Sequence, residues 1–228
     1  MDQAQNSQTA TATEAEANSG RMTLLLICGT PVIVLLASSW LWFYVASGKL
    51  DIVGALGTSN AGELVQPPRQ AAEAGWVSAD GSPFALSSQP RWSLVVPQQS
   101  LTCDENCESR LYEVRQIHQS LGKELGRVQR VLVTDGDPQG VALSVAALSD
   151  DRPLPDDFAA YLATEQRGMK VYGAGDAEFS AMFPELQEYP ASWYLMDPSG
   201  WVMMRYDPTV GYKDVISDLK FLIKNSNG

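Results

Sequence analysis

The uncharged apolar run from Thr23 to Ala46 constrains this chain more than any other feature of its sequence. About 20 apolar residues are enough to cross the hydrocarbon core of a bilayer as a helix. The run ends in four aromatic residues between positions 40 and 44, whose rings favour the headgroup region. A cleaved signal peptide would have a core of about 7 to 15 residues behind a basic segment, and only Arg21 is basic before this run. We therefore predict an uncleaved transmembrane helix over 22–47.

The segments on either side of this helix differ in composition. Residues 1–21 are mainly Gln, Ala, Thr, Ser and Glu, so they cannot bury enough apolar surface to become ordered. Residues 48–75 contain Gly, Ala, Ser and the pair Pro67–Pro68, a composition typical of a linker. The remaining residues, 76–228, have the size of one compact domain. The sequence thus predicts a disordered tail, one membrane helix, a linker and one folded domain.

The charge of the chain argues against nucleic acid as a partner and gives little indication of the membrane orientation. The net charge is -11 and the pI is about 4.5, without a basic stripe that could neutralise a phosphate backbone, so we expect no nucleic acid partner. Arg21 before the helix and Lys49 after it almost cancel under the positive-inside rule. We place the large domain outside the cytoplasm, because a close cysteine pair can form a disulfide in an oxidising compartment.

The folded domain alternates strand and helix patterns. Apolar residues recur at spacings of three and four from Leu111 to Leu125, which indicates an amphipathic helix. The turn residues 197–200 join two apolar runs, which indicates a hairpin. The predicted elements are a short hairpin over 76–86, strands over 92–96, 128–134 and 169–172, a strand or loop edge over 141–148, helices over 103–125, 155–166 and 177–187, a hairpin of 193–196 with 201–206, and a last helix over 212–224.

Cys103 and Cys107 lie where the apolar strand over 92–96 leads into the first long helix. Two residues four apart in a helical turn hold their Cα atoms roughly 6 Å apart, which is within the range of a disulfide. A helix N-terminus lowers a thiol pKa, and we expect Cys103 to be the more exposed cysteine. Asp104, Glu105 and Glu108 oppose this effect with nearby negative charge. The residues predict a modest redox centre, with an inert disulfide that pins a loop to a helix as the structural alternative.

The other sulfur and imidazole groups favour structural interpretations. Cys28 lies inside the predicted membrane helix and is simplest as a small apolar residue. The only histidine, His118, follows Cys107 by eleven residues, about 16 Å along a helix axis. That distance is too long for both to bind one metal ion in the same molecule, so we predict a packed histidine. Met203 and Met204 are interpreted as core residues of a strand.

The order strand, helix, strand, helix, hairpin, helix, with a cysteine pair opening the first long helix, resembles the thioredoxin superfamily. Three segments are similar to its Sco/SenC branch, the membrane-tethered copper chaperones of cytochrome c oxidase: Ser100–Leu111 (SLTCDENCESRL), Arg130–Pro138 (RVLVTDGDP) and Tyr189–Val202 (YPASWYLMDPSGWV). The resemblance covers about residues 76–221. It implies an α/β thioredoxin-like fold, a central mixed sheet flanked by helices, preceded by one transmembrane helix.

The family motif is Cys-Pro-x-x-Cys-Pro, and its two cysteines with one distant histidine bind copper or cycle between dithiol and disulfide. Cys103 and Cys107 match the two cysteines. Asp104 and Glu108 stand in place of the prolines, and Tyr189 stands where the histidine is expected. The sequence therefore departs from the family pattern at the third copper donor.

The resemblance implies a membrane-anchored thiol-disulfide redox protein that assists assembly of the copper centre of cytochrome c oxidase. Cys103 and Cys107 are the predicted catalytic residues, with Cys103 attacking and Cys107 resolving, and no cofactor is required. One alternative is a Cu(I) chaperone in which the same two cysteines are the metal ligands. Another is a non-catalytic assembly scaffold. The implied partners are oxidase subunits or a copper chaperone, and the implied location is the bacterial inner membrane, single-pass, with the C-terminal domain in the periplasm.

Overall fold

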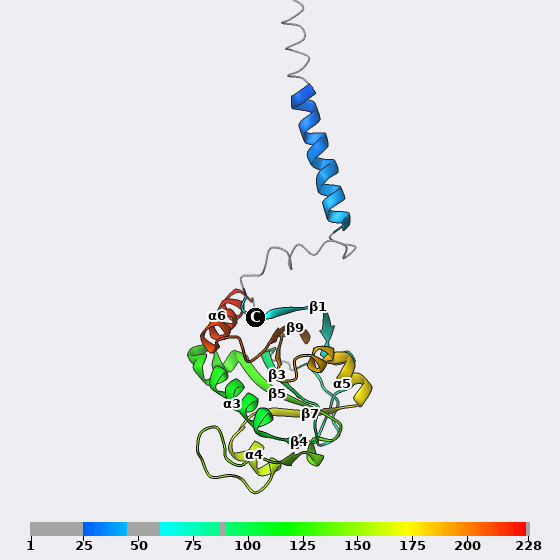
Figure 1. Cartoon of the computed structure of the whole chain (residues 1–228). Coiled ribbons are helices and arrows are strands. Elements are labelled where there is room, and N and C mark those ends of the chain that lie inside the picture. The colour runs from blue at the N-terminus through cyan, green and yellow to red at the C-terminus, as the bar shows by residue number, and fades with distance from the viewer. Residues whose placement is uncertain (1–24, 45–59, 87–89, 227–228) are drawn as a thin grey trace, which may run out of the picture. The chain divides into compact units, whose positions relative to one another are not determined.

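The computed structural model describes residues 25–44, 60–86 and 90–226, which belong to two units that divide after residue 59 (Figure 1). In the first unit, the helix Leu25–Tyr44 is long and apolar enough to cross a membrane. It lies within the helix predicted over 22–47. The predicted disordered tail, 1–21, and the first part of the predicted linker, up to residue 59, lie outside the described residues.

A mixed sheet forms the centre of the second unit. The strands are β1 (Glu63–Gln70), β2 (Val77–Ser78), β3 (Trp92–Gln98), β4 (Thr102–Cys103), β5 (Val128–Asp135), β6 (Ala142–Leu143), β7 (Lys170–Ala174), β8 (Trp193–Met196) and β9 (Trp201–Tyr206). Seven of them form one sheet in the order β1-β9-β8-β3-β5-β7-β2, and β4 pairs with β6 separately. The pairs β3–β5 and β5–β7 are parallel, whereas the other neighbours in the large sheet are antiparallel.

Helices cover both faces of the large sheet. They are α3 (Glu105–Ser120), α4 (Phe158–Thr164), α5 (Asp176–Met182) and α6 (Tyr212–Asn225), with 3-10 helices η1 (Ala71–Glu73), η2 (Gly122–Arg127), η3 (Pro138–Gly140) and η4 (Pro184–Gln187). Figure 1 shows α3 and α6 on one side of the sheet and α5 on the other. Because side chains alternate along a strand, Leu94 packs in the core of α3, α4 and α6, and Val95 packs in the core of α5. The predicted mixed sheet flanked by helices is confirmed.

Strand β1 corrects the linker predicted over 48–75. It pairs antiparallel with β9, and Ala71 and Trp76 just after it are buried in the core on the α5 side. The pair Pro67–Pro68 suggested a linker because proline cannot donate a backbone hydrogen bond. The structure accommodates both prolines because β1 is an edge strand whose register with β9 is interrupted between Leu64 and Arg69. Ordered structure in this unit therefore begins before residue 76.

The first long helix is shorter than the range predicted from 103 to 125. It begins at Glu105 because the Asp104 carboxylate accepts a hydrogen bond from the Cys107 backbone N–H at 3.0 Å and caps the helix. It ends before Gly122, whose φ of 60° is left-handed and favours glycine. Cys103 consequently belongs to strand β4, and Cys107 to the first turn of α3.

Candidate functional site

Cys103 and Cys107 form a disulfide whose Cα atoms are 5.1 Å apart. Two elements position the two sulfurs. Cys103 lies in β4, which runs parallel to β6, and its carbonyl oxygen accepts a hydrogen bond of 2.9 Å from the Ser144 N–H. Cys107 lies in the capped first turn of α3. The spacing of four residues, from which the sequence analysis inferred that a disulfide could form, therefore does allow one.

Both cysteines are buried, so the prediction that Cys103 is the more exposed one is wrong. Cys103 is 0% exposed and Cys107 is 2% exposed. Only Cys107 lines a neighbouring cavity of about 470 Å³, which lies between the end of β3, the start of α3 and the segment Pro190–Ala191. A group that enters this cavity therefore meets the Cys107 side of the disulfide.

Arg110 is a candidate site residue that the sequence analysis missed. It lines the same cavity as Cys107 and is 8% exposed. Its Nη1 donates to the Pro190 carbonyl oxygen at 2.6 Å, and its Nη2 donates to Gln98 Oε1 at 2.9 Å. Burial lowers the pKa of Arg110 to about 10, partly offset by the charge of Asp104, so the group remains cationic at neutral pH. The signal in the sequence was its position three residues after Cys107, on the same helical face.

The three acidic residues near the cysteines do not act together. Asp104 lines the cavity and caps α3. Glu105 is exposed. Glu108 is buried on another side of the helix, where its Oε2 accepts hydrogen bonds from the Ser149 N–H at 3.2 Å and from the Ser149 hydroxyl. The expected opposition to a thiolate therefore comes mainly from Asp104, and Arg110 acts against it.

The folded domain that contains this disulfide matches a known family. The family described as "Transmembrane-like, thioredoxin-like, C-terminal domain" matches residues 92–226, which is more than half of the chain. This chain belongs to that family. The thioredoxin-like fold predicted from the sequence is confirmed. No curated protein matches the sequence.

Solved structures of Sco proteins share the thioredoxin-like fold. Yeast Sco1 matches with a TM-score of 0.50 and 14% identity, over 72% of this chain and 99% of that chain. Yeast Sco1 with copper bound matches with a TM-score of 0.48 and 15% identity, over 75% and 96%. BsSco is described as a member of the Sco family of cytochrome c oxidase assembly proteins with a disulfide switch. It matches with a TM-score of 0.45 and 17% identity, over 75% of this chain and 99% of that chain. At 14% identity, the match to yeast Sco1 at a TM-score of 0.50 shows the fold alone.

Neither Tyr189 nor His118 lies beside the cysteines as a third copper donor. Tyr189 is 40% exposed, lies under the Arg205 guanidinium at 4.0 Å from its ring centre, and lines a different cavity. His118 Nε2 lies 3.0 Å from the Val128 carbonyl oxygen, and burial lowers the pKa of the imidazole. Within residues 25–44, 60–86 and 90–226, no group of three or more His, Cys, Asp or Glu side chains is arranged to hold a metal ion. Among the described residues, these four side-chain types therefore do not complete a three-donor copper site with the cysteines.

Proposed function

We propose that this protein is a membrane-anchored thiol-disulfide redox protein that acts on cysteines of another protein through Cys103 and Cys107. The observation that carries the proposal is the closed disulfide with Cys107 on the wall of a cavity of about 470 Å³. Membership of a transmembrane-like, thioredoxin-like family supports it. An inert disulfide would need no cavity beside its sulfur.

The proposed exchange proceeds in two steps and requires no cofactor. A partner thiolate enters the cavity and attacks Cys107 Sγ, which breaks the bond to Cys103 and forms a mixed disulfide. Cys103 leaves as a thiolate. A second partner thiolate then attacks the partner sulfur of the mixed disulfide, so the partner gains a disulfide and both chain cysteines are reduced. Two electrons pass from partner to chain, and the reverse sequence reduces a partner disulfide.

In the reducing direction, we assign Cys107 as the attacking thiol and Cys103 as the resolving thiol, the opposite of the order expected from the sequence. Cys107 lies in the first turn of α3, where the helix dipole stabilises a thiolate. The guanidinium of Arg110 lines the same cavity and adds a second favourable charge. Cys103, in β4, does not line the cavity.

The substrate proposed for this exchange is a cysteine pair involved in the copper centre of cytochrome c oxidase. The three segments that resemble the Sco/SenC branch support this assignment, since one of them contains both cysteines. The partners would be an oxidase subunit or a copper chaperone. The helix Leu25–Tyr44 would anchor the protein in the bacterial inner membrane, with the thioredoxin-like domain in the periplasm.

Trapping of the mixed disulfide tests the proposal. In cells that make the oxidase, Cys103→Ser removes the resolving thiol, so a partner should remain bound to Cys107 and appear on a non-reducing gel. Cys107→Ser should trap none. The proposal fails if neither variant traps a partner, or if the disulfide potential lies below about -300 mV, as in structural disulfides. Normal oxidase maturation with serine at both positions would instead support a scaffold.

A second candidate function is a Cu(I) carrier. When reduced, Cys103 and Cys107 present two soft thiolates from neighbouring positions, and Cu(I) prefers such ligands. A further donor would come from the partner. Anaerobic Cu(I) titration against a competing chelator tests this: one retained equivalent that Cys103→Ser abolishes would support a carrier. Equal copper retention by the wild type and Cys103→Ser would contradict it.

A further inference from the structure

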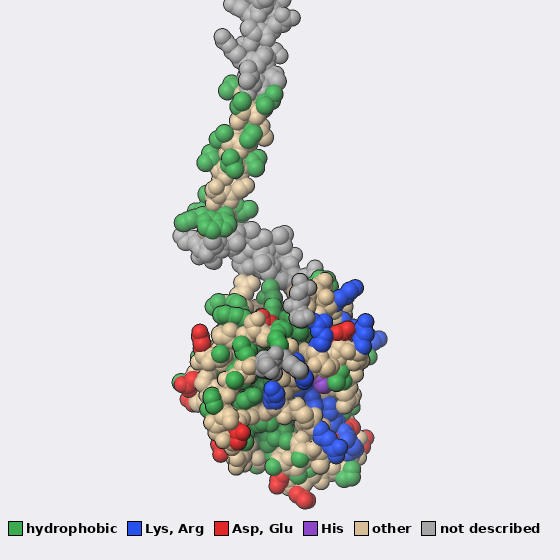
Figure 2. Space-filling view, turned by 180° about the vertical axis from the view of Figure 1, so that it is seen from behind, with side chains coloured by type: hydrophobic (Ala, Val, Ile, Leu, Met, Phe, Trp, Pro, Cys, Tyr) green, Lys and Arg blue, Asp and Glu red, His purple; other side chains and the backbone are tan. Residues whose placement is uncertain are grey.

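A second cavity, of about 390 Å³, is lined mainly by arginines although the chain has a net charge of -11. Figure 2 shows Lys and Arg side chains gathered on one side of the view, next to the histidine. The arginines come from different elements, namely α3, β5, the loop before α4 and the loop after it. The lining residues are Arg115, Gln119, Arg130, Arg152, Thr164, Glu165 and Arg167.

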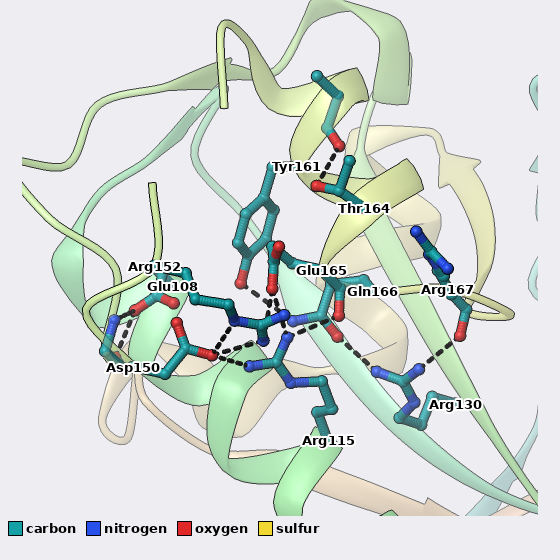
Figure 3. A network of polar contacts seen from close by, with 12 residues as sticks. Glu108, Arg115, Arg130, Asp150, Arg152, Tyr161, Thr164, Glu165, Gln166 and Arg167 are labelled. Carbon is teal, nitrogen blue, oxygen red and sulfur yellow. Dashed lines mark hydrogen bonds and ion pairs between the residues drawn. The ribbon is translucent and has the colours of Figure 1, made fainter. Parts of the chain in front are cut away.

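Two of the four arginines are neutralised within the protein. Arg115 is paired with Asp150 at 2.7 Å and with Glu165 at 2.9 Å. Arg152 is paired with the same two carboxylates, at 2.5 Å and 2.6 Å. Figure 3 shows these two guanidinium groups beside the two carboxylates. These four residues therefore have no net charge.

The other two arginines have no carboxylate partner. Arg130 is 6% exposed, and its guanidinium donates to the neutral Gln166 Oε1 and, at 2.8 Å, to the Arg167 carbonyl oxygen (Figure 3). In the part of the chain that the structure describes, neither Arg130 nor the exposed Arg167 forms an ion pair. Burial lowers the pKa of Arg130, and the nearby charge of Arg115 lowers it further. A buried cation without a counter-charge is costly.

Arg115 also has a buried donor next to this cavity. Its side chain lines the cavity, the residue is 5% exposed, and its Nε–H has no hydrogen-bond partner among the described residues. Buried donors are normally satisfied. The cavity thus combines two ion-paired arginines with two that have no carboxylate partner among the described residues, and the two unmatched positive charges suit an anionic ligand.

We propose that this cavity binds a small soluble dianion that carries a phosphate group. Two unmatched guanidinium charges fit a phosphate monoester, which carries about -1.5 to -2 at pH 7. The planar donor fork of arginine fits phosphate oxygens, with Arg130 and Arg167 as the principal ligands. The Thr164 side chain also lines the cavity. The volume of the cavity is in the range of small-molecule sites, about 300 to 1,000 Å³.

The site is separate from the disulfide. Arg115 follows Cys107 by eight residues on α3, which is about 12 Å along the helix axis. The two cavities share no lining residue. Anion binding can therefore be measured with the disulfide closed, and its outcome is independent of the proposed thiol exchange.

Calorimetric titration of the full chain in a nonionic detergent tests the proposal. Inorganic phosphate at low ionic strength should bind saturably with one site per chain, and sodium chloride of equal ionic strength should not. Arg167→Gln should weaken binding at least about tenfold, because it removes charged hydrogen bonds. Lys213→Gln removes an exposed cation from α6 and should leave binding unchanged.

Three outcomes would overturn the proposal. They are the absence of saturable phosphate binding, equal binding by Arg167→Gln and the wild type, and tighter binding of the dicarboxylate succinate than of phosphate. Arg130→Gln adds a second test where it folds. Because Arg167 is exposed and forms no ion pair within the described residues, we expect Arg167→Gln to fold normally, so a change in its phosphate binding reports on the site itself.

Discussion

Arg110 and Cys107 line one cavity, and in the proposed exchange the charge of the arginine would favour a Cys107 thiolate. The guanidinium cannot turn away easily, because the Pro190 carbonyl oxygen and the Gln98 side chain accept its hydrogen bonds. Gln98 is itself fixed by donating to the carbonyl oxygens of Ser100 and Thr102 at 2.9 and 3.1 Å. The positive charge is thus positioned before any partner arrives.

Arg110→Gln should make the reduced Cys107 less reactive. Loss of the cation raises the thiol pKa, so less thiolate is present at neutral pH. We expect the alkylation rate of the reduced protein at pH 7 to fall roughly tenfold and its pH profile to shift upward by about one pH unit. Arg110→Lys retains the charge and should restore most of the rate. Equal profiles for wild type and Arg110→Gln would show that the arginine has only a structural role.

His118 should contribute to acid sensitivity of the fold. Burial lowers its pKa below the ordinary 6.5 in the folded state, so the unfolded chain binds the proton more readily. Stability is therefore unaffected above about pH 6.5 and decreases as the pH falls from there toward the folded-state pKa. Urea unfolding at pH 7, 6 and 5 should show a smaller loss for His118→Gln than for the wild type. An equal loss would exclude His118 as a contributor.

That Cys103 and Cys107 lie within disulfide distance could be predicted from the sequence, because residues four apart in a helical turn have Cα atoms close enough for a bridge. Their burial could not, since it depends on elements that are distant in the chain. Cys103 is covered through the pairing of β4 with β6, and Arg110 reaches Gln98 only because α3 packs on β3. The arginine cavity was missed for the same reason, since its residues are spread from position 115 to 167.

At the scale of elements, α6 holds the start of the second unit. The buried Asp218 accepts hydrogen bonds from the N–H groups of Ala61 and Gly62 at 2.7 and 3.2 Å, and from the Tyr206 hydroxyl at 3.3 Å. One carboxylate therefore connects the chain before β1, the end of β9 and the middle of α6. Burial and the Asp218 charge both raise the pKa of Tyr206, so its hydroxyl stays a donor.

Asp218→Ala should lower the free energy of unfolding by about 2 to 4 kcal/mol, because it leaves buried donors without a partner. The measurement is urea unfolding of the full chain in detergent, followed by the fluorescence of the domain tryptophans. Asp214→Ala removes an exposed carboxylate one turn earlier on the same helix and should cost less than about 1 kcal/mol. Similar losses for the two variants would contradict the role given to Asp218.

Elements whose signals are local were predicted well, and those fixed by tertiary contacts were not. The strands over 193–196 and 201–206 agree with β8 and β9, because two apolar runs flank a turn in which the Asp197 carboxylate accepts from backbone N–H groups. Strand β1 was missed because its two prolines indicate a linker, and only its pairing with β9 makes it a strand. Helix ends shifted by at most five residues, and a cap decided the start of α3.

At the scale of the whole molecule, the chain combines a span-length apolar helix with a thioredoxin-like domain. Leu35→Arg places a charge near the middle of Leu25–Tyr44, which costs about 2.5 to 3.5 kcal/mol in membrane insertion. We expect a smaller fraction of the protein to remain in membranes after alkaline carbonate extraction. Leu86→Arg changes an exposed leucine of the second unit and should leave that fraction unchanged. Equal retention of both variants would contradict a membrane-spanning role.

Because β4 pairs with β6, we expect the redox state of the disulfide to affect the backbone amide of Ser144, a residue without sulfur. The Ser144 N–H donates to the carbonyl oxygen of Cys103, and the Ala142 N–H donates to that of Leu101. The bridge to Cys107 holds this short ladder against α3. We expect its reduction to speed deuterium exchange at the Ser144 amide relative to amides in the middle of β5. Ser144 would thus serve as a label-free reporter of whether the bridge is open.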